Sequence, residues 1–194
     1  MTFLTDFGDQ AVVLPVAATV AAALMLLGWR RGALAWLTGV LGTLAVVLVL
    51  KLLFGACGGL IPGADIQSPS GHTAAAAVTY GGIVALLGAS ADMTLAFSAV
   101  AAVAFGVSRV VLGLHTPPEV LMGGGVGLAG AALMLRLAGR PPPVKRRNTG
   151  LLAALLVALV LFHGAHVHAE TSISRFARLL EIWPLSVCRA GPSG

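Results

Sequence analysis

The sequence predicts an all-α integral membrane protein built as a helical bundle, and three observations lead to this fold class. Only 10% of the 194 residues are charged, whereas about a quarter of the residues of a soluble domain are charged. Hydrophobic residues make up 58% of the chain, and the mean hydropathy is +0.96. They fall in long runs without charges, as helices that cross a bilayer require. These observations exclude a disordered chain, a disulfide-rich secreted module and an ordinary cytosolic enzyme.

Six apolar stretches predict about six transmembrane helices within one membrane domain, residues 1–170. A transmembrane helix needs roughly 17–25 apolar residues. The stretches are residues 11–28, 32–50, 73–91, 93–112, 119–139 and 148–169. The first three and the last contain no charged residue, and Arg109, Glu119 and Arg136 lie near the ends of the other two.

Basic residues near two of the connections predict the orientation of the bundle. Seven of the twelve lysines and arginines lie in or next to these two connections: Arg30, Arg31, Arg136, Arg140, Lys145, Arg146 and Arg147. With six spans both connections lie on one side, which we assign to the cytoplasm of a bacterial-type inner membrane. The 52–72 connection and the 113–118 turn then face the extracytoplasmic side. The net charge of +5 forms no continuous basic face, so the predicted partner is the bilayer and not a nucleic acid.

Residues 171–194 are predicted to form a separate amphipathic tail. Apolar side chains recur there at intervals of three and four residues, at Ile173, Phe176, Leu180, Trp183 and Val187. Either an interfacial helix on the outer membrane surface or a helix packed onto the bundle satisfies this spacing. Cys188 of the tail and Cys57 both lie on the predicted outer side, either as a disulfide or as two thiols.

Two further groups of residues receive a structural interpretation. Three histidines end the sixth stretch, at His163, His166 and His168. They lack the additional ligands of a four-coordinate metal site, so we interpret them as interfacial residues and predict no metal. Three glycines of the fifth stretch, Gly123, Gly127 and Gly130, indicate close helix packing.

Ionisable side chains at the predicted outer ends of the spans are the first candidates for chemistry, because such residues are costly in a membrane and usually functional. They are Lys51, His72, Arg109, His115 and Glu119. Two cations and two imidazoles that face one space suit an anionic substrate, and phosphate is the first candidate.

The tetrapeptide Pro69–His72 precedes the third stretch and has two interpretations. The start of a helix exposes backbone N–H groups that bind anions, Gly71 permits a close approach, and the Ser70 hydroxyl can donate a further hydrogen bond. The alternative is simply a capped helix start in a loop.

The segment from Ser108 to Glu119 also joins binding and structural features. Arg109 offers a planar fork that can grip two phosphate oxygens. Glu119 follows Thr116 by three residues, the spacing of a capping box. We favour a second role, in which its carboxylate holds one nitrogen of His115 and leaves the other nitrogen available to attack. Both roles hold together only if the carboxylate bridges them.

With these motifs the chain resembles the type 2 phosphatidic acid phosphatase superfamily, which is related to acid phosphatases and vanadium haloperoxidases. That family carries the signatures Lys-x6-Arg-Pro, Pro-Ser-Gly-His and Ser-Arg-x5-His-x3-Asp. Pro69–His72 matches the second signature, and residues 108–119 match the third with Glu119 in place of Asp. Lys51 begins the first signature, whose Arg and Pro positions are Gly58 and Gly59.

The resemblance implies a phosphatase that uses no metal or other cofactor. His115 would be the nucleophile that forms a phosphohistidine, and Glu119 would orient it. His72 would protonate the leaving oxygen and then deprotonate water. The phosphate oxygens would be held by Lys51, Ser70, Gly71 and Arg109.

The substrate implied by the family is a lipid phosphate or diphosphate of the phosphatidic acid, phosphatidylglycerol phosphate or undecaprenyl diphosphate class. A phosphotransferase with the same intermediate is one alternative. Gly58 in place of the family Arg motivates another, a non-catalytic lipid-phosphate binder or transporter.

Overall fold

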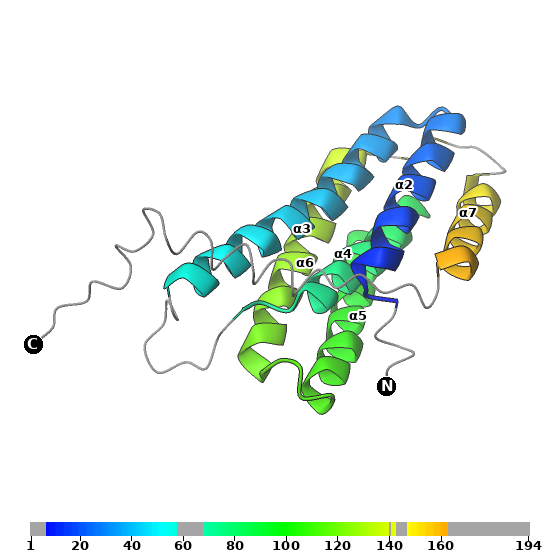
Figure 1. The fold of residues 1–194 in the computed structure, drawn as a ribbon. Helices are drawn as coiled ribbons and strands as arrows, with labels where there is room; N and C mark the ends of the chain where they lie inside the picture. The colour runs from blue at the N-terminus through cyan, green and yellow to red at the C-terminus, as the bar shows by residue number, and fades with distance from the viewer. Residues whose placement is uncertain (1–6, 58–67, 140, 143–146, 163–194) are drawn as a thin grey trace, which may run out of the picture.

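The computed structural model describes residues 7–57, 68–139, 141–142 and 147–162. Within these ranges the chain forms six α-helices and no strand, which confirms the all-α prediction. The helices are α2 (Gln10–Leu26), α3 (Arg30–Cys57), α4 (Gly71–Leu86), α5 (Ala91–Val111), α6 (Pro117–Ala138) and α7 (Arg147–Phe162). Each begins one or two residues before the corresponding predicted stretch, and Figure 1 shows them gathered in one bundle.

Three of the described helices are long and apolar enough to cross a membrane: Arg30–Phe54 within α3, Ala91–Val111 and Pro117–Ala138. Gln10–Leu26 and Asn148–Phe162 are shorter apolar helices, and α4 has 16 residues. A helix rises about 1.5 Å per residue, so the 16 residues of α4 span about 24 Å, which is less than the thickness of a hydrocarbon layer of about 30 Å. The number of six transmembrane helices therefore stays a prediction.

Helix α4 lies against α2, α3, α5 and α6 and forms the centre of the bundle. The run Ala74–Val78 is completely buried. Its small side chains let neighbouring helices approach closely. A Cβ on Gly127 of α6 would lie 2.6 Å from the backbone oxygen of Ala74, and one on Gly123 would clash with the backbone of Ser70. These glycines therefore pack α6 against α4.

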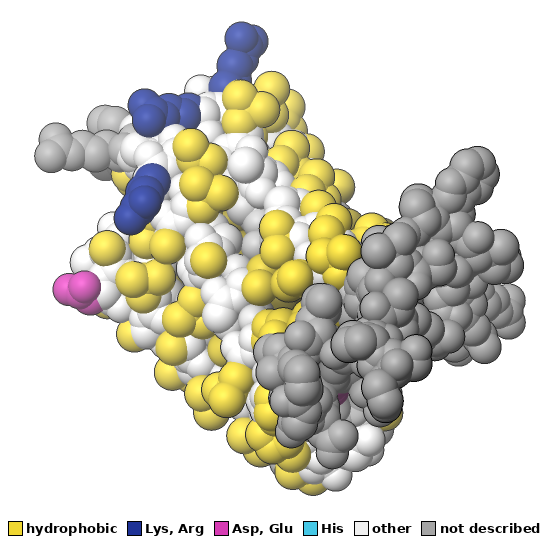
Figure 2. Space-filling model, turned by 90° about the vertical axis from the view of Figure 1, so that its left-hand side faces the viewer, with side chains coloured by type: hydrophobic (Ala, Val, Ile, Leu, Met, Phe, Trp, Pro, Cys, Tyr) yellow, Lys and Arg dark blue, Asp and Glu magenta, His cyan; other side chains and the backbone are white. Residues whose placement is uncertain are grey.

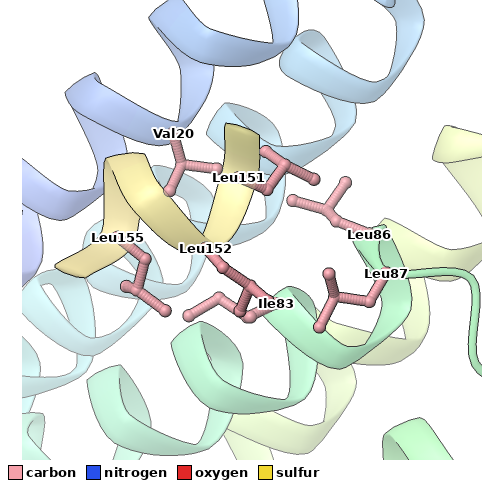
Figure 3. Close-up of a pocket in the computed structure, with 7 residues that line it drawn as sticks. All are labelled: Val20, Ile83, Leu86, Leu87, Leu151, Leu152 and Leu155. Carbon is pink, nitrogen blue, oxygen red and sulfur yellow. The ribbon is translucent and has the colours of Figure 1, made fainter. Parts of the chain in front are cut away.

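Helix α7 packs against α2 and beside the end of α4. Figure 3 shows Leu151, Leu152 and Leu155 of α7 facing Val20 of α2 and the end of α4. The hollow between them has a volume of about 10 Å³, which is the space of one water molecule at most. It is a small packing defect between apolar side chains and not a ligand site.

The start of α3 and the end of α6, which flank the two basic connections in the sequence, lie at one end of the bundle. The Nε atom of Arg31, at the start of α3, donates a hydrogen bond of 2.7 Å to the backbone oxygen of Leu137, near the end of α6. Figure 2 shows Lys and Arg side chains gathered toward the top of that view, with hydrophobic side chains over the surface below. The end of α5 and the starts of α4 and α6 lie at the other end of the bundle, as Figure 1 shows.

Several predictions concern residues outside the described ranges. The amphipathic tail, the three histidines after Phe162, and Cys188 belong to residues 163–194, and Gly58 and Gly59 belong to residues 58–67.

Candidate active site

The start of α4 has the capped geometry that the tetrapeptide Pro69–His72 predicts. Ser70 is the N-cap, and its Oγ accepts hydrogen bonds from the backbone nitrogen of Thr73 at 3.4 Å and from the Thr73 hydroxyl at 2.9 Å. Because Ser70 accepts in both bonds, its own hydroxyl hydrogen can be donated elsewhere. The capped helix start and an anion-binding role are therefore compatible.

Glu119, in the first turn of α6, is joined to the segment before α4. Its Oε1 accepts a hydrogen bond of 2.8 Å from the backbone nitrogen of Ser68, and its backbone oxygen accepts one of 3.0 Å from the nitrogen of Ser70. The second and third signature segments, far apart in the sequence, are thereby held together by hydrogen bonds.

The other carboxylate oxygen of Glu119 performs both roles that its spacing suggests. Oε2 lies 2.9 Å from Nδ1 of His115 and accepts a hydrogen bond of 3.0 Å from the backbone nitrogen of Thr116. The His115 and Glu119 side chains are only 3% and 6% exposed. A carboxylate at Nδ1 favours a proton on that nitrogen, so the lone pair of the neutral ring is on Nε2. This is the form of histidine that can act as a nucleophile.

Lys51 and Arg109 bring two cations to this end of the bundle. Both are buried, at 8% and 6% exposed. A Cβ on Gly71 would lie 3.8 Å from Cε of Lys51, so the lysine side chain lies beside the start of α4. Arg109 is in the last turn of α5, and its backbone oxygen accepts a hydrogen bond of 3.0 Å from Leu114, next to His115. Each of these two buried cations can pair with an oxygen of an anion such as phosphate.

The turn between Arg109 and His115 depends on Gly113. Its φ of +67° lies in the left-handed region, which side chains with a Cβ rarely adopt. The turn ends α5 and returns the chain to α6 within a few residues. His115 therefore faces the same end of the bundle as Arg109.

One residue of this region, Asp9, is missing from the sequence predictions. Its Oδ2 lies 3.6 Å from Nε2 of His72. Spacing does not reveal this pair because Asp9 lies in front of α2 and His72 in the first turn of α4. An acidic residue directly before the first apolar stretch was the available signal.

An apolar groove runs along α5 and α6 next to the candidate site. It has a volume of about 570 Å³, and every residue that lines it is Ala, Val, Gly, Leu or Pro. Val110, which follows Arg109, and Pro117, which lies between His115 and Glu119, belong to its lining. The groove therefore begins where the polar site ends.

Comparisons with known proteins agree with the motifs. A family model of the PAP2 superfamily matches residues 32–142. A curated protein of Klebsiella pneumoniae named "Uncharacterized 22.5 kDa protein in cps region" is 36% identical over 189 residues, which cover 90% of this chain and 88% of that protein. No solved structure matches the chain. Asp9 lies before the range that the family model matches.

Proposed function

The chain belongs to the PAP2 superfamily, whose members are phosphatases, and on this premise we propose that it is a membrane-embedded lipid phosphate or diphosphate phosphatase. The observation that carries the proposal is the buried pair of His115 and Glu119, 2.9 Å apart, in which the backbone oxygen of Glu119 accepts a hydrogen bond from Ser70 at the start of α4. A histidine oriented by a carboxylate is suited to nucleophilic attack, because the carboxylate selects the tautomer and stabilises the positive ring that forms.

In the first half of the reaction, Nε2 of His115 attacks phosphorus. The bond between phosphorus and the lipid oxygen breaks, and His72 gives its proton to that oxygen. The products are the free lipid alcohol, or a lipid monophosphate where the substrate is a diphosphate, and a phosphohistidine at His115.

In the second half, the neutral His72 takes a proton from a water molecule. The water oxygen attacks phosphorus, and the bond between phosphorus and Nε2 breaks. Inorganic phosphate leaves, and both histidines return to their starting protonation states. We assign no metal or other cofactor to either half.

The remaining side chains of the site would hold the phosphate oxygens. Lys51 and Arg109 supply positive charge, the Ser70 hydroxyl supplies a hydrogen, and the backbone N–H of Gly71, the first residue of α4, is a further donor. Donors that are already in position stabilise the charge that develops at phosphorus without reorganisation.

The apolar groove along α5 and α6 supports a lipid substrate. A phosphate held near Arg109 and His115 leaves the apolar chain of the molecule next to Val110 and Pro117, where the groove begins. With a volume of about 570 Å³, the groove is large enough for part of an acyl or prenyl chain, because a water molecule occupies about 30 Å³ and a methylene group is of similar size.

We further propose that the protein lies in a bacterial-type inner membrane with the site on the extracytoplasmic side. At the end of the bundle opposite the site, Arg30 and Arg31 begin α3 and Arg136 lies in the last turn of α6, and the positive-inside rule assigns that end to the cytoplasm.

The test is phosphate release by the detergent-purified protein in the presence of EDTA. Phosphatidic acid, phosphatidylglycerol phosphate and undecaprenyl diphosphate are supplied separately. We expect release from at least one lipid, and a loss of at least ~10³-fold in kcat for His115→Ala. A lipid carrying ³²P should label the wild-type protein through an acid-labile bond and leave His115→Ala unlabelled.

Other outcomes identify the alternatives. Equal background rates for the wild type and His115→Ala, together with lipid binding, would contradict the enzyme and indicate a binder or transporter. Transfer of the label to an added alcohol in preference to water would indicate a phosphotransferase.

A further inference from the structure

Asp9 uses its two carboxylate oxygens for different contacts. Oδ1 accepts a hydrogen bond of 2.8 Å from the backbone nitrogen of Ala11 and so caps α2. Oδ2 faces Nε2 of His72 at 3.6 Å, and the side chains of Asp9 and His72 are 12% and 16% exposed. The capping role accounts for the contact of Oδ1 but not for that of Oδ2.

The segment that carries Asp9 is packed against the site. The hydroxyl of Tyr80 in α4 donates a hydrogen bond of 3.3 Å to the backbone oxygen of Phe7. A Cβ on Gly8 would lie 2.9 Å from the ring of Phe105 and 3.2 Å from the backbone oxygen of His72. The backbone before α2 therefore lies directly on the first turn of α4, with Asp9 next to it.

The core also fixes α2 relative to α4. Val12, Val13 and Val16, which follow Asp9 in α2, are 1% exposed. A rigid, buried helix start gives the carboxylate a defined position, in contrast to a carboxylate on a mobile surface loop.

We infer that Asp9 is a positioning residue for His72 in the reaction proposed above, on which this inference rests. A separation of 3.6 Å is longer than a hydrogen bond, so the carboxylate acts through its charge. The carboxylate orients Nε2 of His72 toward α2. It lies beside the imidazole ring, which must carry a positive charge before His72 protonates the leaving oxygen. Nδ1 is then the nitrogen that exchanges the proton with the lipid oxygen and with water.

The two contacts of Asp9 can be separated by substitution. Asparagine and serine cap a helix about as well as aspartate but carry no charge. Asp9→Asn and Asp9→Ser should therefore leave the N-terminal cap of α2 intact and remove the negative charge beside His72. Ser90→Ala is the matched control, because Ser90 caps α5 through Met93 and α5 begins at the opposite end of the bundle from His72.

The experiment measures kcat and KM for phosphate release from the lipid that the wild type hydrolyses, in the wild-type and His72→Ala backgrounds. In the wild-type background we expect Asp9→Asn and Asp9→Ser to lower kcat about 10- to 100-fold, which is part of what a general acid contributes. KM should stay within about twofold, because the phosphate-binding groups are unchanged. In the His72→Ala background neither substitution should lower kcat further.

Two results would overturn the inference. One is a wild-type kcat in both Asp9 variants. The other is the same fold loss in both backgrounds, which would indicate a structural role only. Either result combined with an inactive His115→Ala leaves the phosphatase proposal intact, whereas a wild type without phosphatase activity overturns both proposals.

Discussion

The two histidines of the candidate site each lie beside one carboxylate, and the chain assembles these two regions in different ways. His115 and Glu119 are four residues apart, at the start of one helix, and are 2.9 Å apart in space. His72 and Asp9 begin two different helices and are 3.6 Å apart. The first pair forms through a turn and a helix cap, whereas the second exists only because α2 packs against α4. A disturbance of helix packing should therefore affect the second pair first.

Removing the charge of Glu119 from the pair of His115 and Glu119 should have the largest effect on kcat. Glu119→Gln keeps the size of the side chain but no longer stabilises the positive ring of His115, so we expect kcat to fall about 10²- to 10⁴-fold. Single-turnover formation of the phosphohistidine measures the effect directly. Glu119→Asp, which keeps the charge and restores the family residue, should lose much less. A kcat within threefold of the wild type for Glu119→Gln would exclude the orienting role.

Filling the groove should change KM and not kcat, because the groove would bind the lipid chain and not the reacting phosphate. Gly125 lines the groove, and a Cβ there meets no atom within 4 Å, so Gly125→Leu fills the groove without a clash. We expect KM for a long-chain lipid phosphate to rise about 10-fold while kcat changes little, and a short-chain analogue to be unaffected.

The matched control for the groove is Gly42→Leu. Gly42 in α3 is also exposed with open space around it, but it does not line the groove. The lipid-chain role fails if KM rises equally for the two chain lengths, or equally in both leucine variants.

A smaller effect should follow from moving Asp9 without changing any charge. Gly8→Ala places a Cβ too close to Phe105 and to the backbone of His72, so the segment before α2 must shift. We expect kcat to fall about 3- to 10-fold, since small displacements of catalytic groups are costly. Phe105→Leu in the same chain should restore part of the activity. A loss that this second substitution leaves unchanged would show that contact with Phe105 is not the cause.

The smallest effect on activity is expected at the end of the bundle far from the site. Ser90→Ala removes the hydrogen bond to Met93 and should lower the free energy of unfolding by about 1 kcal/mol. The value of kcat should stay within about twofold of the wild type. Thermal unfolding in detergent and phosphate release measure the two quantities, and a large loss of kcat would mean that the two ends are coupled.

The local features of the site were predictable because they depend on neighbours in the chain. The spacing of Thr116 and Glu119 indicates a capping box, and the spacing of His115 and Glu119 indicates an imidazole–carboxylate pair. One oxygen of Glu119 satisfies both, as the sequence allows. Ser70 likewise caps α4 as its position before an apolar helix predicts. Such contacts need only one helix turn to form.

The contacts between segments were not predictable in the same way. The hydrogen bond from Ser68 to Glu119, the approach of Asp9 to His72 and the groove beside Gly125 all depend on which helix faces join. Most helices of this chain are apolar over a large part of their surface, because lipid and core are both apolar. Periodicity therefore says little about which face of a helix contacts which neighbour.

The amino-acid sequence by itself determined the all-α class and, through its apolar runs, the approximate positions of six helices. Its scarcity of charge makes the candidate site visible. Tertiary structure alone decided that α4 lies at the centre, that α4 is the helix against which Gly123 and Gly127 pack, and that the carboxylate of Asp9 lies beside His72. The physical reason is the range of the interactions. Apolar runs, caps and turns act between near neighbours in the chain, whereas the position of Asp9 results from the packing of α2 against α4.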